Sequence, residues 1–191
     1  MKKEKKLNDI QLLNQVPAQS RQTGVNMIAF KIKNIKQFMG KFLASEAFDL
    51  FLVEEASIST YNTFQIDGRQ NREFYTAEEW EDKEIRPYDF TEWKKLRPIC
   101  YSLIKGNRTP CAFKFVLHLI PEHAAPILQK GDTGITPQQV KAFVLTVKYD
   151  ENGLTLVTGT SFHTFIMDKS ADELWDKAMG RFLDKMGVVY E

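Results

Sequence analysis

The stretch that decides the fold reads Val140-Lys-Ala-Phe-Val-Leu-Thr-Val-Lys-Tyr149, Asp150-Glu-Asn-Gly153, Leu154-Thr-Leu-Val-Thr158. Two segments rich in β-branched and other apolar residues flank four residues that favour a turn. Asn and Gly at the end of that turn tolerate the backbone conformation that a tight reversal needs. The stretch therefore predicts a β-hairpin, with antiparallel strands over 140–149 and 154–158.

The segment before this hairpin predicts a strand and a short helix. Residues 112–119 alternate in polarity and place four large apolar residues on one face: Phe113, Phe115, Leu117 and Leu119. Pro121 suits the first turn of a helix over 121–130, and Gly131 is a residue that commonly ends one. Strand, helix and hairpin thus follow one another in this half of the chain.

The segment after the hairpin predicts one more strand and a C-terminal helix. Gly159 interrupts the alternating pattern, and a separate strand is expected over 162–167. Ser170 and Glu173 have the spacing of a capping box at the start of a helix over 170–187. The apolar residues of that helix recur at helical spacing and form its expected buried face: Trp175, Met179, Phe182 and Met186.

The N-terminal half begins with the same order of elements. Residues 28–32 alternate as a half-buried strand does, and Asn34 can cap a helix with Gln37 three residues later. The helix that follows carries one apolar face: Ile35, Phe38, Met39, Phe42 and Leu43. A strand, then a helix that packs on it, is the structure these residues predict.

Further strands are expected up to residue 75. Residues 50–53 form an apolar run, and residues 56–66 alternate in polarity over their whole length. Asp67-Gly68 is a turn signal, so residues 72–75 are expected to pair back across it.

Charge is distributed unevenly in the middle of the chain. Residues 73–92 hold eight acidic and two basic residues, whereas residues 93–108 hold five basic residues and no acid. Helices are plausible over 77–84 and 90–104, with Pro98 expected to kink or split the second. A loop with Gly, Asn and Pro follows, before the strand that opens the second half.

These elements predict an α+β fold made of two related halves. Residues 27–75 and 110–168 each read strand, helix, strands, and both open with Ala-Phe-Lys. Residues 76–109 connect the halves, and the mainly antiparallel sheet is expected to be packed by helices. This order of elements resembles one domain of a DNA sliding clamp, which implies helices that turn basic faces toward DNA.

Composition limits the class of protein. The chain has 191 residues, a net charge of +1 and 43% hydrophobic residues, with only 10 Gly and 7 Pro. Ample apolar material excludes a polar disordered chain, low Gly and Pro exclude a collagen-like chain, and the balanced charge excludes a polycation. Residues 27–191 are expected to form a single domain.

Residues 1–26 form a separate basic leader. They carry five basic residues, two acids and no aromatic residue, which gives the leader +3 and the remaining body −2. The leader is interpreted either as a flexible extension or as a basic arm that touches an anionic partner. No apolar run long enough for a signal peptide core or a membrane span occurs. Two cysteines, Cys100 and Cys111, match no zinc motif; free buried thiols and a cytoplasmic location are expected, with a single disulfide between them as the alternative.

Four motifs resemble a family of bacterial proteins of unknown function: Phe64-Gln-Ile-Asp-Gly68, Trp93-Lys-Lys-Leu-Arg-Pro98, Leu103-Ile-Lys-Gly-Asn-Arg-Thr-Pro110 and Thr158-Gly-Thr160. The resemblance covers the chain from Met27 to its end. It implies a bacterial origin and supports Met27 as the natural start. It brings no activity, cofactor or site residue with it.

Five basic residues are candidates for contacts with an anion or a nucleic acid: Lys33, Lys36, Lys41, Lys105 and Arg108. The first three mark the outer face of the first helix, which a clamp would turn toward DNA. The last two lie in the loop 105–110, whose amides and charges could hold a phosphate. A solvated helix face and charge pairing with the acidic stretch 73–92 are the alternatives.

No catalytic motif is found. Ser161 and His163 share a strand face if the strand is regular, but no nucleophile elbow supports them. The histidines have no metal-ligand spacing, so neither a metal nor another cofactor is expected. The sequence favours a non-enzymatic binding or interaction module, whose partner is a protein or a second copy. A clamp-like nucleic-acid-associated protein and an unrecognised enzyme built from Lys105, Arg108 and His163 are the alternatives.

Overall fold

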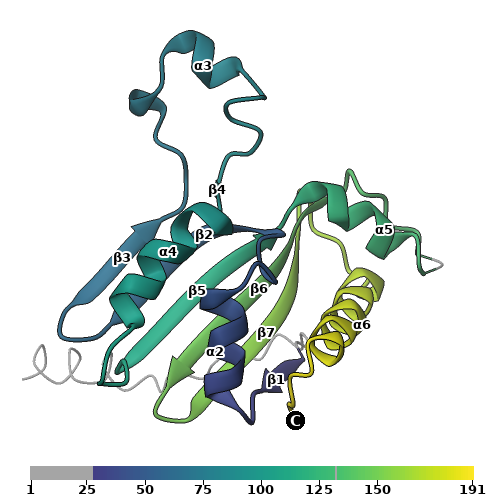
Figure 1. The fold of residues 1–191 in the computed structure, drawn as a ribbon. Coiled ribbons are helices and arrows are strands. Elements are labelled where there is room, and N and C mark those ends of the chain that lie inside the picture. Colours follow the sequence, from purple (N-terminus) through teal and green to yellow (C-terminus); the bar gives the residue numbers. More distant parts are fainter. Residues whose placement is uncertain (1–27, 132) are drawn as a thin grey trace, which may run out of the picture.

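The computed structural model describes residues 28–131 and 133–191, and these form a mixed α+β structure built on one antiparallel sheet (Figure 1). Along the sheet the strands follow the order β1-β7-β6-β5-β2-β3, and β4 also pairs with β2. Their bounds are β1 Ala29–Lys31, β2 Phe51–Ser59, β3 Thr63–Asp67, β4 Thr91–Glu92, β5 Ala112–Leu119, β6 Val140–Asp150 and β7 Gly153–Phe162.

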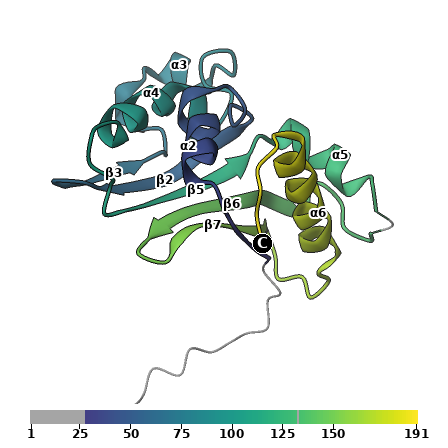
Figure 2. The same cartoon turned by 60° about the horizontal axis from the view of Figure 1, so that its bottom comes forward.

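Three longer helices cover one face of this sheet, which curves around them (Figure 2). They are α2 (Ile35–Ala44), α4 (Trp93–Ile104) and α6 (Ser170–Lys185). The shorter helical segments are η1 (Arg72–Phe74), α3 (Ala77–Glu81), η2 (Pro121–His123) and α5 (Ala124–Leu128). Among the described residues, no helix combines the length and the apolar character that crossing a membrane requires.

The hairpin predicted over residues 140–158 is confirmed as β6 and β7. Their register pairs Tyr149 with Leu154 and Asp150 with Gly153, whose φ of 104° only glycine adopts readily. The prediction of a break at Gly159 and a new strand over 162–167 is wrong. β7 runs through Gly159, opposite Val144, because a glycine inside a ladder keeps its backbone hydrogen bonds.

The expected single strand over 56–66 is in fact two strands. β2 ends at Ser59, the chain turns through Thr60, Tyr61 and Asn62, and β3 pairs back on β2. The amide of Thr60 donates to the carbonyl of Asn62 at 2.9 Å within this turn. The alternation of polar and apolar residues continues through residues 60–62, so this pattern did not indicate that the chain reverses direction there.

The sequence signals for caps and breaks in the helices are confirmed only in part. Asn34 caps α2, since its Oδ1 accepts the Gln37 amide at 3.0 Å. Pro98 lies inside a continuous α4 and neither splits it nor ends it. Ser170 is the first residue of α6 instead of its cap, and the Asp168 carboxylate accepts the Ser170 amide at 2.8 Å.

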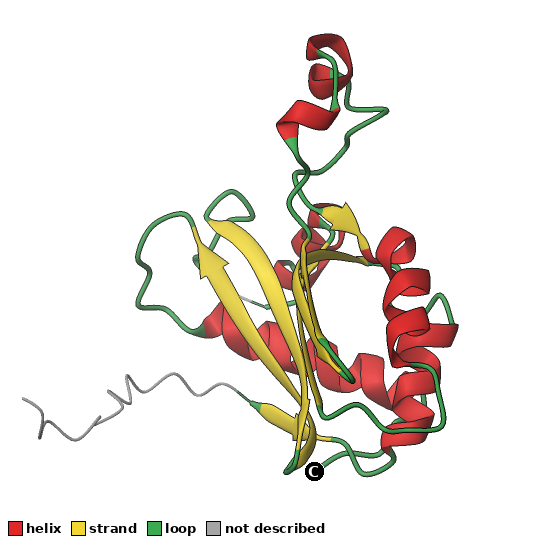
Figure 3. Cartoon of the chain, turned by 90° about the vertical axis from the view of Figure 1, so that its left-hand side faces the viewer, coloured by secondary structure: helices red, strands yellow, loops and turns green. Residues whose placement is uncertain are grey.

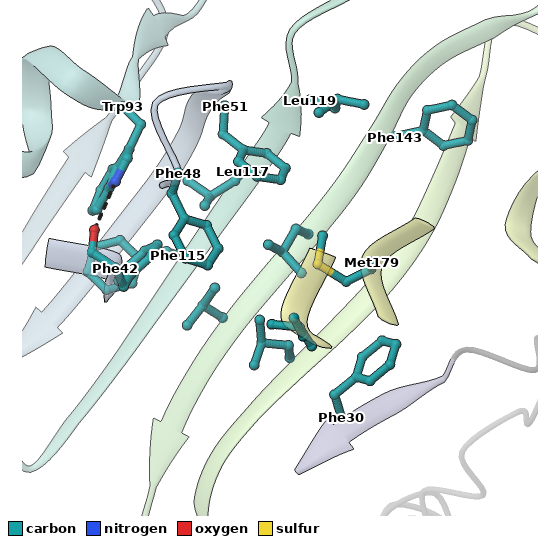
Figure 4. Packing of buried hydrophobic residues seen from close by; sticks show 14 of the residues in the cluster. Phe30, Phe42, Phe48, Phe51, Trp93, Phe115, Leu117, Leu119, Phe143 and Met179 are labelled. Carbon is teal, nitrogen blue, oxygen red and sulfur yellow. Dashed lines mark hydrogen bonds between the residues drawn. The ribbon is translucent and has the colours of Figure 1, made fainter. Parts of the chain in front are cut away.

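The core lies between the sheet and the three helices and is dominated by aromatic rings (Figure 4). Phe42 of α2 stacks on Trp93 of α4 at 4.5 Å between ring centroids, and Trp93 Nε1 donates to the Phe42 carbonyl at 3.2 Å. Phe51 of β2 packs near Trp175 of α6 at 6.3 Å. Burial of several such rings is the main source of stability, because each removes a large apolar area from water.

The two halves of the chain share the order of their elements but not their place in the sheet. β1, α2, β2 and β3 make up the first half, and β5, η2 with α5, β6 and β7 the second. β1 lies beside β7, at the far side of the sheet from β2 and β3. A common origin of the halves stays a prediction, and the leader 1–26 lies outside the described residues.

The two ends of the sheet are treated differently. At the β1 end, residues 189–191 pair with the outer side of the strand: the Lys31 amide donates to the Glu191 carbonyl at 2.8 Å and the Glu191 amide to the Lys31 carbonyl at 3.0 Å. At the other end, no described strand pairs with the outer side of β3. We call these the covered edge and the open edge.

Candidate functional site: a projecting arm and its root

β3 and β4 are two parts of one edge strand, interrupted by an excursion of the chain. Both are antiparallel to β2, and Asp67 of β3 lies opposite Glu55 while Thr91 of β4 lies opposite Val53. Between them residues 68–90, which we call the arm, leave the sheet and project away from its body (Figures 1 and 3). The edge strand thus continues on both sides of a segment that contributes no residue to the buried core.

The root of the arm is closed by backbone hydrogen bonds. The Thr91 amide donates to the Gly68 carbonyl at 2.8 Å, and the Gln70 amide donates to the Asp89 carbonyl at 3.0 Å. Arg69 and Phe90 form an isolated bridge between these two bonds. The two legs of the arm therefore leave the sheet side by side, which fixes its direction.

A glycine is required where the arm leaves the sheet. β2 has a bulge between Val53 and Glu55, and the Gly68 amide donates to the Glu54 carbonyl at 3.0 Å. A Cβ atom on residue 68 would lie 1.7 Å from the carbonyl oxygen of Val53. Only a residue without a side chain fits there, so the Asp67-Gly68 signal marks the exit of the arm and not the expected hairpin turn.

The outer part of the arm is held together by Trp80 and Arg86. The Arg86 guanidinium lies over the Trp80 ring at 3.6 Å from its centroid and is only 5% exposed. It also donates to the Trp80 carbonyl at 3.2 Å, the Tyr88 carbonyl at 3.3 Å and the Asp89 carboxylate at 2.8 Å. A planar donor of this kind satisfies several backbone acceptors at once, so the arm has its own small interior.

Residues 72–75 belong to this arm instead of pairing across residues 67–68 as expected. Arg72–Phe74 form a 3₁₀ turn capped by Asn71, whose Oδ1 accepts the Glu73 amide at 3.1 Å. The following helix α3 begins with a complete capping box of Thr76 and Glu79. Local side-chain caps thus compete successfully with strand formation here.

A stack of side chains holds the arm against the face of the sheet opposite the three long helices. The Arg69 guanidinium lies 5.1 Å from the centroid of Phe90, and the Phe90 ring meets the His118 ring edge to face at 5.0 Å. His118 Nε2 lies 2.7 Å from a Glu54 carboxylate oxygen. Because His118 is 8% exposed, this stack also covers the end of β5.

Two adjoining hollows flank the stack. One of about 620 Å³ lies on the arm side and the other, of about 720 Å³, over β2 and β3. Asp67 and Arg69 line both, so the hollows form one groove at the root of the arm. Charges in it are largely matched, as in the Lys114 to Glu55 ion pair at 2.6 Å.

The returning leg is tied to the body as well. Tyr88 Oη donates to the Glu122 carboxylate at 3.2 Å, and burial together with the Glu122 charge raises the pKa of Tyr88. At the start of α4, burial alone would raise the pKa of Glu92. Ion pairs with Lys94 at 2.7 Å and Lys95 at 2.9 Å lower this pKa by more than burial raises it, so the net direction is downward.

The structure separates the five predicted anion contacts into three places. Lys33 pairs with the Glu191 carboxylate at the covered edge. Lys36 and Lys41 line a shallow hollow on the outer side of α2, and Lys105 and Arg108 line another beside the β2–β3 turn. No lining residue is shared by these two hollows. Contact with an anion or a nucleic acid therefore stays a prediction for each group separately.

The residues of the alternative enzyme, Lys105, Arg108 and His163, do not converge. Arg108 precedes the first residue of β5, whereas His163 follows β7 near the last residue of β5. The eight residues of β5 span about 25 Å, too far for one reacting geometry. Within the described ranges, no group of three or more His, Cys, Asp or Glu side chains could hold a metal ion.

The cysteines are both free. Cys100 is buried in α4, and burial raises its pKa to about 12. Cys111 is exposed, which corrects the expectation that both thiols are buried.

Sequence reasoning missed the arm as a unit. Its acidic run was visible, but that run was interpreted as a connector between halves. The signal that could have found it is the aromatic and arginine content between Asp67 and Thr91: Arg69, Arg72, Phe74, Tyr75, Trp80, Arg86, Tyr88 and Phe90. Rings and guanidinium groups in a polar stretch can form a small interior of their own.

The part of the chain from α2 to the C-terminus matches a known family profile. A family of unknown function, DUF5721, matches residues 41–191, which include the arm, its root and both hollows. The chain belongs to this family. Membership confirms the predicted relation to a family of unknown function and assigns the arm no role. Neither the curated proteins nor the solved structures yield a match.

Proposed function

We propose that the protein is a non-enzymatic interaction module whose arm, residues 68–90, contacts a partner protein. The observation that carries this is the projection of an internally packed arm from an otherwise continuous edge strand. Loops that a rigid scaffold holds in a defined direction commonly carry function. The arm adds nothing to the core between sheet and helices, so a role outside the fold accounts for its elaborate internal structure.

Two large apolar side chains of the arm, which we call its tip residues, are exposed to solvent. Phe74 is 82% exposed and Ile85 is 47% exposed, although both lie close in sequence to the packed Trp80 and Arg86 pair. Large exposed apolar side chains on a projecting segment suit insertion into a partner's pocket. Phe74 meets Tyr75 edge to face at 5.3 Å, which restrains its ring before any partner arrives.

The charge around this tip indicates the kind of partner. The arm holds seven acidic and four basic residues, and Glu78, Glu81, Asp82 and Glu84 are exposed around α3. An apolar tip within an acidic surround is complementary to an apolar pocket with a basic rim. A protein with such a pocket is the partner we propose, and the acidic surround disfavours a nucleic acid at this site.

The arm can be removed cleanly because of the way its root is closed. Replacing residues 69–90 by Asn-Gly makes Gly68 and Thr91 the first and fourth residues of a β-turn. The closing bond of such a turn, from the Thr91 amide to the Gly68 carbonyl, already exists at 2.8 Å. The variant keeps β3, β4 and the core, and the temperature of unfolding checks that the body stays folded.

The test begins with a photocrosslinking amino acid at position 74, in cells that express the full chain. Position 165 is the matched control, because Phe165 is also a highly exposed aromatic residue, at 91%. We expect a discrete protein adduct from position 74 alone. The purified partner should then bind the Asn-Gly variant at least about 100-fold more weakly than the wild type, and bind Phe165→Ala unchanged.

Two results contradict the proposal. One is a partner that binds the Asn-Gly variant as tightly as the wild type. The other is the absence of a discrete adduct from position 74. A point variant separates the contact from the fold of the arm. Phe74→Ala leaves the Trp80 and Arg86 pair intact, so it should weaken binding without changing the tryptophan fluorescence of the chain, to which Trp80 contributes.

A further inference from the structure

We propose that two copies of this chain pair through the open edge, β3 against β3 in antiparallel orientation. The unpaired side of β3 presents backbone donors and acceptors to solvent, which is a template for another strand. The opposite end of the same sheet is capped by the pairing of residues 189–191 with Lys31 and Lys33. β3 is thus the end of the sheet to which a strand can be added.

One register matches the side chains of two copies. With Gln65 on the two-fold axis, all five residues of β3 are paired, Thr63 lies opposite Asp67, and Phe64 lies opposite Ile66. Residues directly opposite each other in a sheet point to the same side. The half-buried Phe64 and Ile66 of both copies therefore extend one apolar face, while the exposed Thr63, Gln65 and Asp67 extend the other.

The charges within the strand fit the same register. No like charges face each other, because Asp67 meets a threonine. Just beyond the strand, in the turn between β2 and β3, Tyr61 is 84% exposed and meets Phe64 edge to face at 5.8 Å.

An extended segment of another protein could use the same backbone groups, but it would not need this symmetry. The pairing of Thr63 with Asp67 and of Phe64 with Ile66 arises only when the added strand has the sequence of β3 itself. A second copy is therefore the occupant that these residues favour. Because the arm leaves the end of β3, the two arms of the dimer lie at opposite ends of the joined strands.

Light scattering of the full chain after size exclusion, over a range of concentrations, measures the dimer. Gln65→Lys brings two positive charges face to face on the axis and should weaken dimerisation at least about tenfold. Thr63→Lys adds the same charge to the same strand but opposite Asp67, so it should leave dimerisation equal or tighter. Both positions are exposed, so neither variant is expected to unfold the chain.

Disulfide trapping tests the register independently. In a Cys111→Ser background, which removes the exposed thiol, Gln65→Cys should form a dimer disulfide because the two Cα atoms lie within about 6 Å. Thr63→Cys should not, since its two copies lie about 14 Å apart along the strands. A mixture of Thr63→Cys and Asp67→Cys chains should form the crossed disulfide.

A chain that is monomeric at every concentration overturns the proposal, and so does a dimer that responds equally to Gln65→Lys and Thr63→Lys. Disulfide formation at position 63 as readily as at 65 would show a different register and would equally overturn it. These outcomes do not depend on the arm tip, so they leave the proposed partner contact to its own test.

Discussion

The covered edge and the open edge of this sheet solve the problem of exposed backbone groups differently. At the covered edge, a segment that lies at the far end of the sequence pairs with β1 and satisfies its outer groups. At the open edge, β3 is short, is interrupted by the arm and has no described strand beside it. The difference teaches that one end of the sheet is built for stability, and the other end carries the features that suit contact with other molecules.

The largest expected effect is a loss of stability in Gly68→Ala, at the point where the arm leaves the open edge. In Gly68→Ala, the new Cβ would lie 1.7 Å from the Val53 carbonyl oxygen, so β2 and β3 must move apart. We expect a loss of about 3 kcal/mol or more in the free energy of unfolding, as for other substitutions that force backbone apart. Urea denaturation followed by tryptophan fluorescence measures it.

Gly159→Ala is the matched control for this prediction. Gly159 also lies within the sheet, but no atom outside its neighbours comes within 4 Å of an added Cβ. The control should change the free energy of unfolding by less than about 1 kcal/mol. Equal effects of the two substitutions would show that loss of glycine itself, and not the contact with Val53, decides the result.

An intermediate effect is expected at the covered edge. The Tyr190 ring meets Phe30 edge to face at 5.0 Å, and its hydroxyl donates to Asp184 at 3.1 Å. Tyr190→Ala should cost about 1–2 kcal/mol. It should also speed hydrogen exchange of the Lys31 and Lys33 amides, which donate to the tail.

The open edge provides the comparison for that variant. Tyr61→Ala, made at a concentration where the chain is monomeric, should change the free energy of unfolding by less than about 0.5 kcal/mol because the ring is 84% exposed. If Tyr61→Ala costs as much as Tyr190→Ala, the two edges are equally important to the fold and the distinction between them fails.

The smallest effect concerns pH and again lies near the covered edge. Asp176 of α6 is 7% exposed and accepts a hydrogen bond from Thr158 of β7. Burial raises the pKa of Asp176, the charges of Asp172 and Glu173 raise it further, and the Thr158 hydrogen bond only partly offsets this. The folded chain therefore holds this proton more tightly than the unfolded chain does.

The sign of the pH effect follows from that difference. The stabilising contribution of protonated Asp176 is complete below the ordinary pKa of an aspartate and is lost as pH rises through the raised value. Asp176→Asn keeps a neutral side chain, so its stability relative to the wild type should increase over this range. Urea denaturation at several pH values measures the difference, and parallel pH curves for the two proteins would contradict the prediction.

What the sequence could predict is what neighbouring residues determine. The hairpin of β6 and β7 was predicted because its turn and both strands are contiguous, and the cap of α2 because Asn34 and Gln37 are three residues apart. The α+β class followed from the same local patterns. The predicted apolar faces of α2 and α6 supply the buried residues Phe38, Phe42, Trp175 and Met179.

What the sequence could not predict depends on residues that are distant in the chain. That Asp67 and Thr91 continue one edge strand is decided by their pairing with β2, and 23 residues separate them. The helical turn at residues 72–75 depends on caps and on the arm's interior, which periodicity does not report. The basic residues of α2 and of the loop after α4 could be named from sequence, but only the fold shows that they line different hollows.

The covered edge also affects the order in which strands become paired while the chain is synthesised. Lys33 and Glu191, which pair beside β1, are 158 positions apart in the chain. During synthesis β1 therefore emerges from the ribosome long before the residues that cover it, and β7, its other neighbour, also comes late. The first strand of the described residues is thus among the last of them to be paired, so the nascent chain exposes β1 on both sides until β7 and the tail have been translated.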